Sequence, residues 1–299
     1  MQILITGGTG LIGRQLCKAL LAEGHELTVL SRNPASVPVK CGAGVHALAS
    51  LAQWQPGQTF DAVINLAGEP IVDKSWTAKR KQALWASRVT LTEELVRRIA
   101  AANHRPAVLL SGSAVGYYGN RGDVMLDEAA EVGENFAAQL CKAWEDAARV
   151  AESVGVRVCL LRTAPVLSND GGLLGRMLPL FRLGLGARLG DGKQWMSWVH
   201  MQDYVAMVLG LLHDPHAAGP YNMAAPQPVT NAEFTATLAA ALHRPALFVA
   251  PALLLKLGMG ERASLLLEGQ RVLPGKMAAA QYRFTFTNLA DALRDLLGK

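Results

Sequence analysis

The chain has 299 residues, of which 51% are hydrophobic and 18% are charged, and its formal net charge is +5. This composition supplies a core and excludes general disorder, and the length fits one large domain plus a smaller one. The densest basic cluster, at residues 79–88, lies inside a predicted helix. Nucleic-acid binding requires a coherent basic face with interleaved aromatic residues, so we expect no nucleic-acid partner.

The cysteine and histidine spacings argue against disulfide bonds and a metal site. Cys17, Cys41, Cys141 and Cys159 form no C-x-x-C pair, and the seven histidines are scattered along the chain. We therefore expect reduced thiols and no metal. The apolar N-terminal segment lacks a basic leader, and no run of about 20 apolar residues occurs, so we expect a cytoplasmic protein that contacts no membrane.

The first predicted elements are a strand, a glycine-rich turn and a helix. Residues 2–6 (QILIT) are predicted to form a short buried strand, and apolar residues recur at helical spacing over residues 11–20. Between them, Gly7 can make the turn, Gly10 can let a phosphate approach the backbone, and Gly13 can let the helix pack closely. The unpaired amides at the start of the helix suit a pyrophosphate. This arrangement predicts dinucleotide binding, with a purely structural turn as the alternative.

The second predicted strand indicates which dinucleotide is bound. It covers residues 26–31 and ends in Ser-Arg-Asn-Pro, where an NAD site usually carries an acidic residue for the ribose 2′-hydroxyl. Here Ser31 offers a hydroxyl, and Arg32 offers a planar, permanently charged group that matches a phosphate dianion. The pair predicts NADP(H) rather than NAD(H). A solvated surface arginine is the alternative for Arg32.

Apolar strands and helices alternate through the first half of the chain. This pattern predicts an α/β fold, a Rossmann-type doubly wound parallel sheet with a cofactor at the carboxyl ends of its strands. Further strands are expected at residues 45–48, 62–68, 107–113 and 156–166, and helices at about 77–102 and 135–154.

The composition and the hydrophobic pattern of the sequence change after Pro165. The chain is rich in glycine and loop-like to about residue 192, and helices are expected at residues 203–212 and 288–297, the last with Asn288 as its N-cap. We expect residues 1–165 to form the NADP-binding Rossmann domain, with residues 195–222 returning to it, and residues 166–194 and 223–299 to form a smaller substrate-side α/β part.

Small residues and hydroxyls follow two of the predicted strands. Leu66, Ala67 and Gly68 would let the cofactor lie against the backbone, and a simple strand-end turn is the alternative. The later segment SGSAVGYYG presents two serines, Ser111 and Ser113, followed by two tyrosines, Tyr117 and Tyr118. A serine hydroxyl there can polarise a carbonyl or hold a sugar hydroxyl, and a tyrosine can exchange its proton. A buried turn with aromatic packing is the alternative for this segment.

These motifs together resemble a known family over nearly the whole chain. TGGTGLIG, SRNP, NLAGEPI, SGSAVGYYG, LRTAPVL, PLFRLGLG and SWVHMQDY are similar, in order and spacing, to the atypical epimerase branch of the extended short-chain dehydrogenases/reductases. The tail, with PALLLKLGMGE and GQRVLPGKM, resembles the C-terminal domain of unknown function found in that branch. The resemblance implies a cofactor site lined by Gly7, Thr9, Gly10, Leu11, Ile12, Ser31, Arg32, Leu66 and Ala67. It also implies that Arg88 contacts the cofactor, whereas from the residues alone Arg88 is an ordinary charge on a helix surface.

The sequence departs from the superfamily at its acid/base pair. Active members carry Tyr-x-x-x-Lys on the helix after the fifth strand, where one helical turn puts both side chains on one face. None of the five tyrosines has a lysine four positions on. The tyrosine's place is taken by Phe136 or Ala137 and the lysine's by Leu140 or Cys141, while Lys142 is expected on the surface.

A non-standard catalytic set is therefore expected. Ser113 matches the superfamily's catalytic serine approximately, and Tyr117 or Tyr118 is the candidate proton donor. The expected function is an NADP(H)-dependent oxidoreductase or epimerase acting on a small polar or nucleotide-sugar-like substrate. The alternative is a binding module that uses NADPH for sensing or structure without turnover.

Two further features leave a structural and a functional interpretation open. His200 and Asp203 invite a catalytic role, but an acid at a helix start is more often structural. The helices at residues 77–102 and 135–154 can form the face of a homodimer, although Trp85 and Trp144 on them can equally belong to the core.

Overall fold

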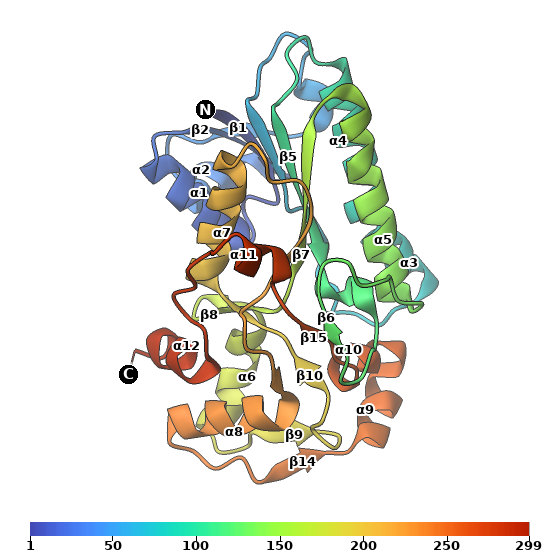
Figure 1. Cartoon of the computed structure of the whole chain (residues 1–299), viewed down its shortest axis with the longest axis vertical. Helices are drawn as coiled ribbons and strands as arrows, with labels where there is room; N and C mark the ends of the chain where they lie inside the picture. Colours follow the sequence, from blue (N-terminus) through green and yellow to red (C-terminus); the bar gives the residue numbers. More distant parts are fainter. Residues whose placement is uncertain (299) are drawn as a thin grey trace.

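A seven-stranded parallel sheet forms the centre of the larger part of the protein (Figure 1). The structure is a computed structural model that describes residues 1–298. The strand order is β12-β7-β5-β4-β1-β2-β3. In chain order the strands are β1 (Gln2–Thr6), β2 (Glu26–Leu30), β3 (His46–Leu48), β4 (Ala62–Asn65), β5 (Val108–Ala114), β7 (Arg157–Thr163) and β12 (Gly219–Met223). The predicted Rossmann-type doubly wound fold is confirmed. The strand order reverses between β1 and β4, where such folds bind their ligands.

The register of the sheet brings the predicted motifs to one edge. Thr6, the last residue of β1, lies opposite Leu30 of β2 and Asn65 of β4. Asn65 in turn lies opposite Ser111 of β5. Because all these strands are parallel, the segments that follow them emerge on the same side of the sheet.

Helices cover both faces of this sheet (Figure 1). One face carries α1 (Leu11–Ala22), α2 (Val37–Cys41) and α7 (Met201–His213), and the other carries α3 (Ala78–Trp85), α4 (Leu91–Ala101) and α5 (Phe136–Arg149). A hydrophobic core lies on each face of the sheet, and alternate residues of β1 point into one or the other. Ile3 and Ile5 pack with α1, and Leu4 packs with α4. The period of two that a strand imposes therefore divides the core into two layers.

The helix predicted over residues 77–102 is continuous but not regular. A π-helical turn, Ala86–Thr90, separates α3 from α4, and Arg88 lies on it. Such turns occur frequently at functional sites. On α5, whose N-cap is Asn135, Trp144 is buried, whereas Trp85 of α3 is 41% exposed. The homodimer face stays a prediction.

The smaller part lies below the sheet in the view of Figure 1 and holds mainly short elements. Its helices are α6 (Gly172–Arg182), α8 (Asn231–Leu242), α9 (Ala252–Met259), α10 (Ser264–Leu267) and α12 (Leu289–Leu296), and α11 (Gly275–Ala279) lies near β12. Its strands have two or three residues each and form two-stranded sheets. The paired strands are β8 (Val166–Ser168) and β11 (Val199–His200), β9 (Ala187–Leu189) and β14 (Phe248–Ala250), β10 (Trp195–Met196) and β13 (Val229–Thr230), and β6 (Met125–Leu126) and β15 (Arg271–Val272).

Helix α6 corrects the prediction of a loop after Pro165. Leu174, Leu178 and Phe181 recur at helical spacing and are buried in the core of the smaller part. Burial contributes roughly 1.5–3 kcal/mol for each such side chain, which exceeds the roughly 1 kcal/mol that a glycine within a helix costs. The prediction for the last helix is confirmed, because Asn288 accepts a hydrogen bond from the Asp291 amide at 3.0 Å as the N-cap of α12.

Two of the expectations from composition can be compared with the structure. All four cysteines are buried and carry free thiols, as predicted. Within residues 1–298, no helix has both the length and the apolar character needed to cross a membrane.

Candidate functional site

The glycine turn between β1 and α1 has the geometry that the sequence predicts. Gly7 has a φ of +72°, and a Cβ added to it would lie 2.6 Å from the Leu66 carbonyl group. A Cβ on Gly13 would overlap the Gly7 carbonyl oxygen, so this glycine allows the close packing of helix and turn. Gly10 is the N-cap of α1 and has no side chain to bind the first amides of the helix. Those amides therefore remain free for an anionic ligand.

The segment after β4 lies directly against this turn. The Leu66 amide donates to the Thr6 carbonyl oxygen at 3.1 Å, and the Ala67 amide donates to the Thr6 hydroxyl at the same distance. Leu66 and Ala67 are half-buried, as are Thr9, Leu11 and Ile12 on the opposite side of the turn. The structure thus brings together most of the residues predicted to line the cofactor site.

Arg32 lies at the end of β2 with 92% of its side chain exposed, and it forms an ion pair with Glu69 at 2.7 Å. Arg80 binds the other oxygen of that carboxylate at 3.3 Å. The hydrogen bonds from Arg32 and Arg80 hold the pKa of Glu69 below its ordinary value. Ser31 is buried, and its hydroxyl donates to the Asn33 carbonyl oxygen at 3.1 Å, so it shapes the turn that carries Arg32.

Arg88 of the π-helical turn lies beside the segment that follows β4. Its guanidinium donates to the Glu69 carbonyl oxygen at 2.9 Å and lies over the Trp144 ring, 5.4 Å from the ring centroid. A Cβ on Gly68 would lie 3.0 Å from this guanidinium, so glycine provides the space that Arg88 occupies. Burial lowers the pKa of Arg88 from its ordinary value. Its predicted contact with a cofactor stays a prediction.

A polar cavity of about 360 Å³ opens beside the glycine turn. Its lining residues are Arg14, Gln15, Lys18, Lys40, Cys41 and Asp170. The Cys41 thiol donates to the Gly8 carbonyl oxygen at 3.4 Å, which joins α2 to the turn. The three cations in the lining make this side of the turn favourable for anionic groups.

A buried hydrogen-bond network lies behind the ends of β1, β4 and β5. The Asn65 amide oxygen accepts from the Thr6 hydroxyl at 2.6 Å, and its nitrogen donates to Thr92 at 2.8 Å and to Ser111 at 3.1 Å. Trp144 donates to the same Thr92 hydroxyl at 3.0 Å. Ser111 is fully buried in this network, so its side chain holds Asn65. The predicted contact of Ser111 with the cofactor stays a prediction.

A second buried network lies at the end of β5 and centres on an ion pair. Arg162 of β7 and Glu145 of α5 are each 3% exposed, and they form two parallel hydrogen bonds of 2.8 and 2.9 Å. Ser113 donates its hydroxyl proton to the same carboxylate at 2.7 Å. Burial opposes the charge of Arg162, but the hydrogen bonds and charge of Glu145 outweigh it and raise the arginine pKa above its ordinary value.

The two tyrosines after β5 differ in their surroundings. Tyr118 is fully buried, donates to the Asn222 side chain at 2.6 Å and accepts from Arg162 at 3.0 Å. Burial raises its pKa to about 12. Both hydrogen bonds are made within the protein, and the role of Tyr118 as a proton donor to substrate stays a prediction. Tyr117 is half-buried, and the Arg162 guanidinium lies 3.6 Å from the centroid of its ring. Its hydroxyl forms no hydrogen bond with any group of residues 1–298.

Helix α5 carries apolar or inert groups where the superfamily has its acid/base pair. Ala137 and Cys141 are 7% and 6% exposed, and burial raises the pKa of the Cys141 thiol to about 11. Lys142 is on the surface, as predicted, and binds Asp146 at 2.6 Å. These placements agree with the loss of the tyrosine and lysine pair in the sequence.

His200 and Asp203 have structural partners. The Nδ1 atom of His200 accepts from the Gln202 amide at 3.1 Å, which makes His200 the N-cap of α7. Asp203 is buried and accepts from the amides of Thr285 and Phe286 at 2.8 and 2.9 Å. These contacts support the structural interpretation, because they join α7 to the C-terminal segment.

The strand order, the glycine turn and the free helix amides are typical of Rossmann proteins that bind dinucleotides. The chain matches the NAD dependent epimerase/dehydratase family over residues 3–224 and a domain of unknown function, DUF1731, over residues 250–296. The chain belongs to the NAD dependent epimerase/dehydratase family, and the resemblance to its epimerase branch is confirmed.

Similar proteins of this branch span nearly the whole chain. An epimerase family protein of Mycobacterium bovis is 41% identical over 295 residues, which cover 97% of this chain and 96% of that protein. A chloroplastic SDR39U1 homologue of Arabidopsis thaliana is 37% identical over 304 residues, covering 99% and 87% of the two chains. The crystal structure of the human epimerase family protein SDR39U1 (isoform 2) with NADPH is 34% identical, with a TM-score of 0.91 and 100% of both chains covered.

Proposed function

We propose that this protein binds NADP(H) and acts as an oxidoreductase or epimerase on a small polar substrate such as a nucleotide sugar. The observation that carries the proposal is the glycine turn, in which Gly7 and Gly13 have no room for a side chain and the first amides of α1 are free. The human relative, whose crystal structure contains NADPH, supports the same cofactor. When bound, the nicotinamide ring supplies or accepts a hydride.

Arg32 provides the preference for the phosphorylated cofactor. Its guanidinium extends from the end of β2, where an NAD-binding protein carries an acid, and 92% of the side chain is exposed. A planar, permanently charged group forms two parallel hydrogen bonds to a phosphate. Arg88, held beside Gly68, adds a second cation at the end of β4.

Tyr117 is the proton donor in this proposal. Its hydroxyl is free of hydrogen bonds to residues 1–298, and its ring is fixed against Arg162. When a substrate carbonyl is reduced at carbon, this phenol gives its proton to the carbonyl oxygen, and it recovers a proton in the reverse direction. Ser113 lies near the same strand end and orients the substrate, while Glu145 fixes the serine hydroxyl.

Calorimetric titration with NADPH, NADP+ and NADH tests the cofactor assignment. We expect binding that depends on the 2′-phosphate, so that NADPH and NADP+ bind and NADH binds far more weakly. Equal affinities for NADPH and NADH would contradict the role of Arg32. Failure of all three to bind would overturn the interpretation of the glycine turn.

Turnover is tested by mixing the NADPH complex with carbonyl compounds and nucleotide sugars. Absorbance and products are both followed, because an epimerase regenerates its cofactor within each cycle. Tyr117→Phe is expected to lower turnover by about 10²–10⁴-fold, since it removes a general acid. Tyr118→Phe is the matched control and is expected to retain turnover. Unchanged turnover in Tyr117→Phe, alone and combined with Tyr118→Phe, would remove both tyrosines from the mechanism.

A sensing or structural NADPH-binding module is the second candidate function. It is favoured by the absence of a tyrosine and a lysine at the expected places of the acid/base pair, which are Phe136 or Ala137 and Leu140 or Cys141. The use of the Ser113 hydroxyl within the protein favours it as well. Tight NADPH binding without oxidation and without any altered product would support this candidate over the enzyme.

A further inference from the structure

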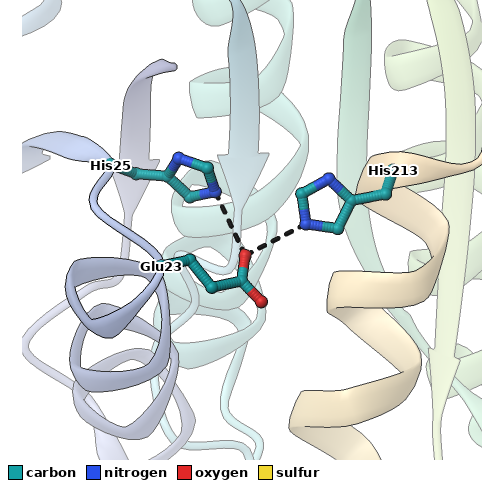
Figure 2. A group of neighbouring side chains, drawn as sticks. All are labelled: Glu23, His25 and His213. Carbon is teal, nitrogen blue, oxygen red and sulfur yellow. Dashed lines mark hydrogen bonds and ion pairs between the residues drawn. The ribbon is translucent and has the colours of Figure 1, made fainter.

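Three potential metal ligands meet at the end of the sheet opposite the glycine turn. Figure 2 shows Glu23, His25 and His213 pointing toward one another from three elements. Glu23 is the C-cap of α1, His25 directly precedes β2, and His213 is the last residue of α7. Glu23 and His213 are 190 positions apart in the chain, which explains why the scattered histidines predict no metal site.

We propose that these three side chains form a binding site for a divalent transition-metal ion of the Zn²⁺ type. The Nε2 atoms of His25 and His213 lie 3.1 and 3.0 Å from the same Glu23 oxygen, Oε2, and all three ligand atoms lie within 4.8 Å of one another. Ligand atoms bound to a tetrahedral zinc ion at about 2.0–2.1 Å are about 3.3 Å apart. Small side-chain movements therefore suffice to bind the ion.

The chemistry of the donors determines which ions fit. Two imidazole nitrogens and one carboxylate oxygen are ligands that zinc and similar ions prefer, whereas magnesium and calcium prefer oxygen alone. Water completes the coordination, and an entry path exists because the side chains of Glu23 and His213 are 36% and 49% exposed.

The backbone around the site restricts the movement of the ligands. Helices α1 and α7 pack against each other on one face of the sheet (Figure 1), and His25 directly precedes β2. The rings of His25 and His213 are 5.9 Å apart between centroids, and Nδ1 of His25 lies 3.3 Å from the Met1 amino group. A bound ion would join the end of α7 to the corner between α1 and β2, so its role is structural.

Titration of the untagged 299-residue chain with ZnCl₂ after removal of metals by EDTA tests the site. We expect one zinc ion per chain, a higher melting temperature with zinc, and no such response to MgCl₂. His25→Ala, His213→Ala and Glu23→Gln should each abolish both responses. The control His216→Ala changes an exposed histidine just beyond α7 and should retain them.

Circular dichroism in EDTA shows whether each variant is folded, and NADPH binding, which involves the other end of the sheet, should not change. Zinc binding that persists in all three variants would overturn the proposal, because it would place the ion elsewhere. The absence of binding by the unmodified chain, or equal responses to zinc and magnesium, would overturn it as well.

Discussion

The glycine turn and the end of β5 lie at the same edge of the sheet but are built in different ways. At the turn, the polar groups are backbone amides and the exposed Arg32, whose partner Glu69 is at the surface. At the end of β5, Ser113, Tyr118 and Arg162 are buried; Ser113 and Arg162 bind Glu145, and Arg162 donates to Tyr118. The first region keeps its hydrogen-bonding capacity for a ligand, and the second uses it within the protein.

This difference shows that residue type alone does not define a site. Serine and tyrosine occur in both the catalytic prediction and the buried network, but a buried polar group that already has its partners is a structural group. Tyr117 differs from Tyr118 because its hydroxyl lacks a partner within residues 1–298. The chemistry of the site therefore depends on the groups that the fold leaves accessible.

Breaking the buried ion pair has the largest expected effect. Arg162→Met leaves the Glu145 carboxylate buried without its cation, and we expect the free energy of unfolding to fall by about 3–5 kcal/mol. Urea denaturation measures the change. Arg176→Met is the control, because it removes an exposed ion pair with Asp73 and should cost less than about 1 kcal/mol. Similar losses in both variants would contradict the difference between buried and exposed pairs.

Removing the exposed arginine should affect the ligand and leave the fold intact. We expect Arg32→Ala to weaken NADPH binding by about 10–100-fold, since hydrogen bonds to charged groups are worth about 1.5–3 kcal/mol. NADH binding and the free energy of unfolding should change little. Calorimetry on this variant and on Arg97→Ala, an exposed arginine of α4, makes the comparison. Equal losses for NADPH and NADH would remove Arg32 from the 2′-phosphate site.

The glycine turn was predictable because its determinants are local in sequence. Gly7, Gly10 and Gly13 lie between one strand and one helix, and the positive φ of Gly7 and the close approach of Gly13 follow from that short segment. The six strands predicted from apolar runs are present for the same reason.

The partners of the polar groups were not predictable in this way. Glu69 lies 37 positions from Arg32, and Glu145 lies 32 positions from Ser113, so only the tertiary fold brings them together. A signal existed in part, because Arg162 interrupts an apolar strand and a charge there requires a buried partner. Helix α6 was missed because its glycines obscured three apolar residues at helical spacing.

Tyr118→Phe tests whether the second tyrosine belongs to the fold alone. Losing its hydrogen bonds to Asn222 and Arg162 should lower the free energy of unfolding by about 1–2 kcal/mol and leave NADPH binding unchanged. Burial raises the pKa of Tyr118 to about 12, above its ordinary value near 10. The folded state therefore holds this proton more tightly, and the stability it contributes is present below pH 10 and is lost as the pH rises toward 12.

Urea denaturation at pH 8 and pH 11 measures both effects in Tyr118→Phe. The difference in stability between the variant and the unmodified chain should shrink at the higher pH. Loss of turnover at unchanged stability would instead return Tyr118 to the catalytic set.

Glu69→Gln gives the smallest expected change. It tests how freely the Arg32 guanidinium beside the glycine turn can bind a ligand. Glu69 binds Arg32 at 2.7 Å, so it competes with a 2′-phosphate for the guanidinium. We expect NADPH to bind several-fold more tightly to the variant, while NADH is little affected. The gain should vanish in the Arg32→Ala background, because the two substitutions act through one interaction. A gain that persists without Arg32 would mean that Glu69 acts only by long-range repulsion, and no gain at all would mean that the ion pair costs nothing to open.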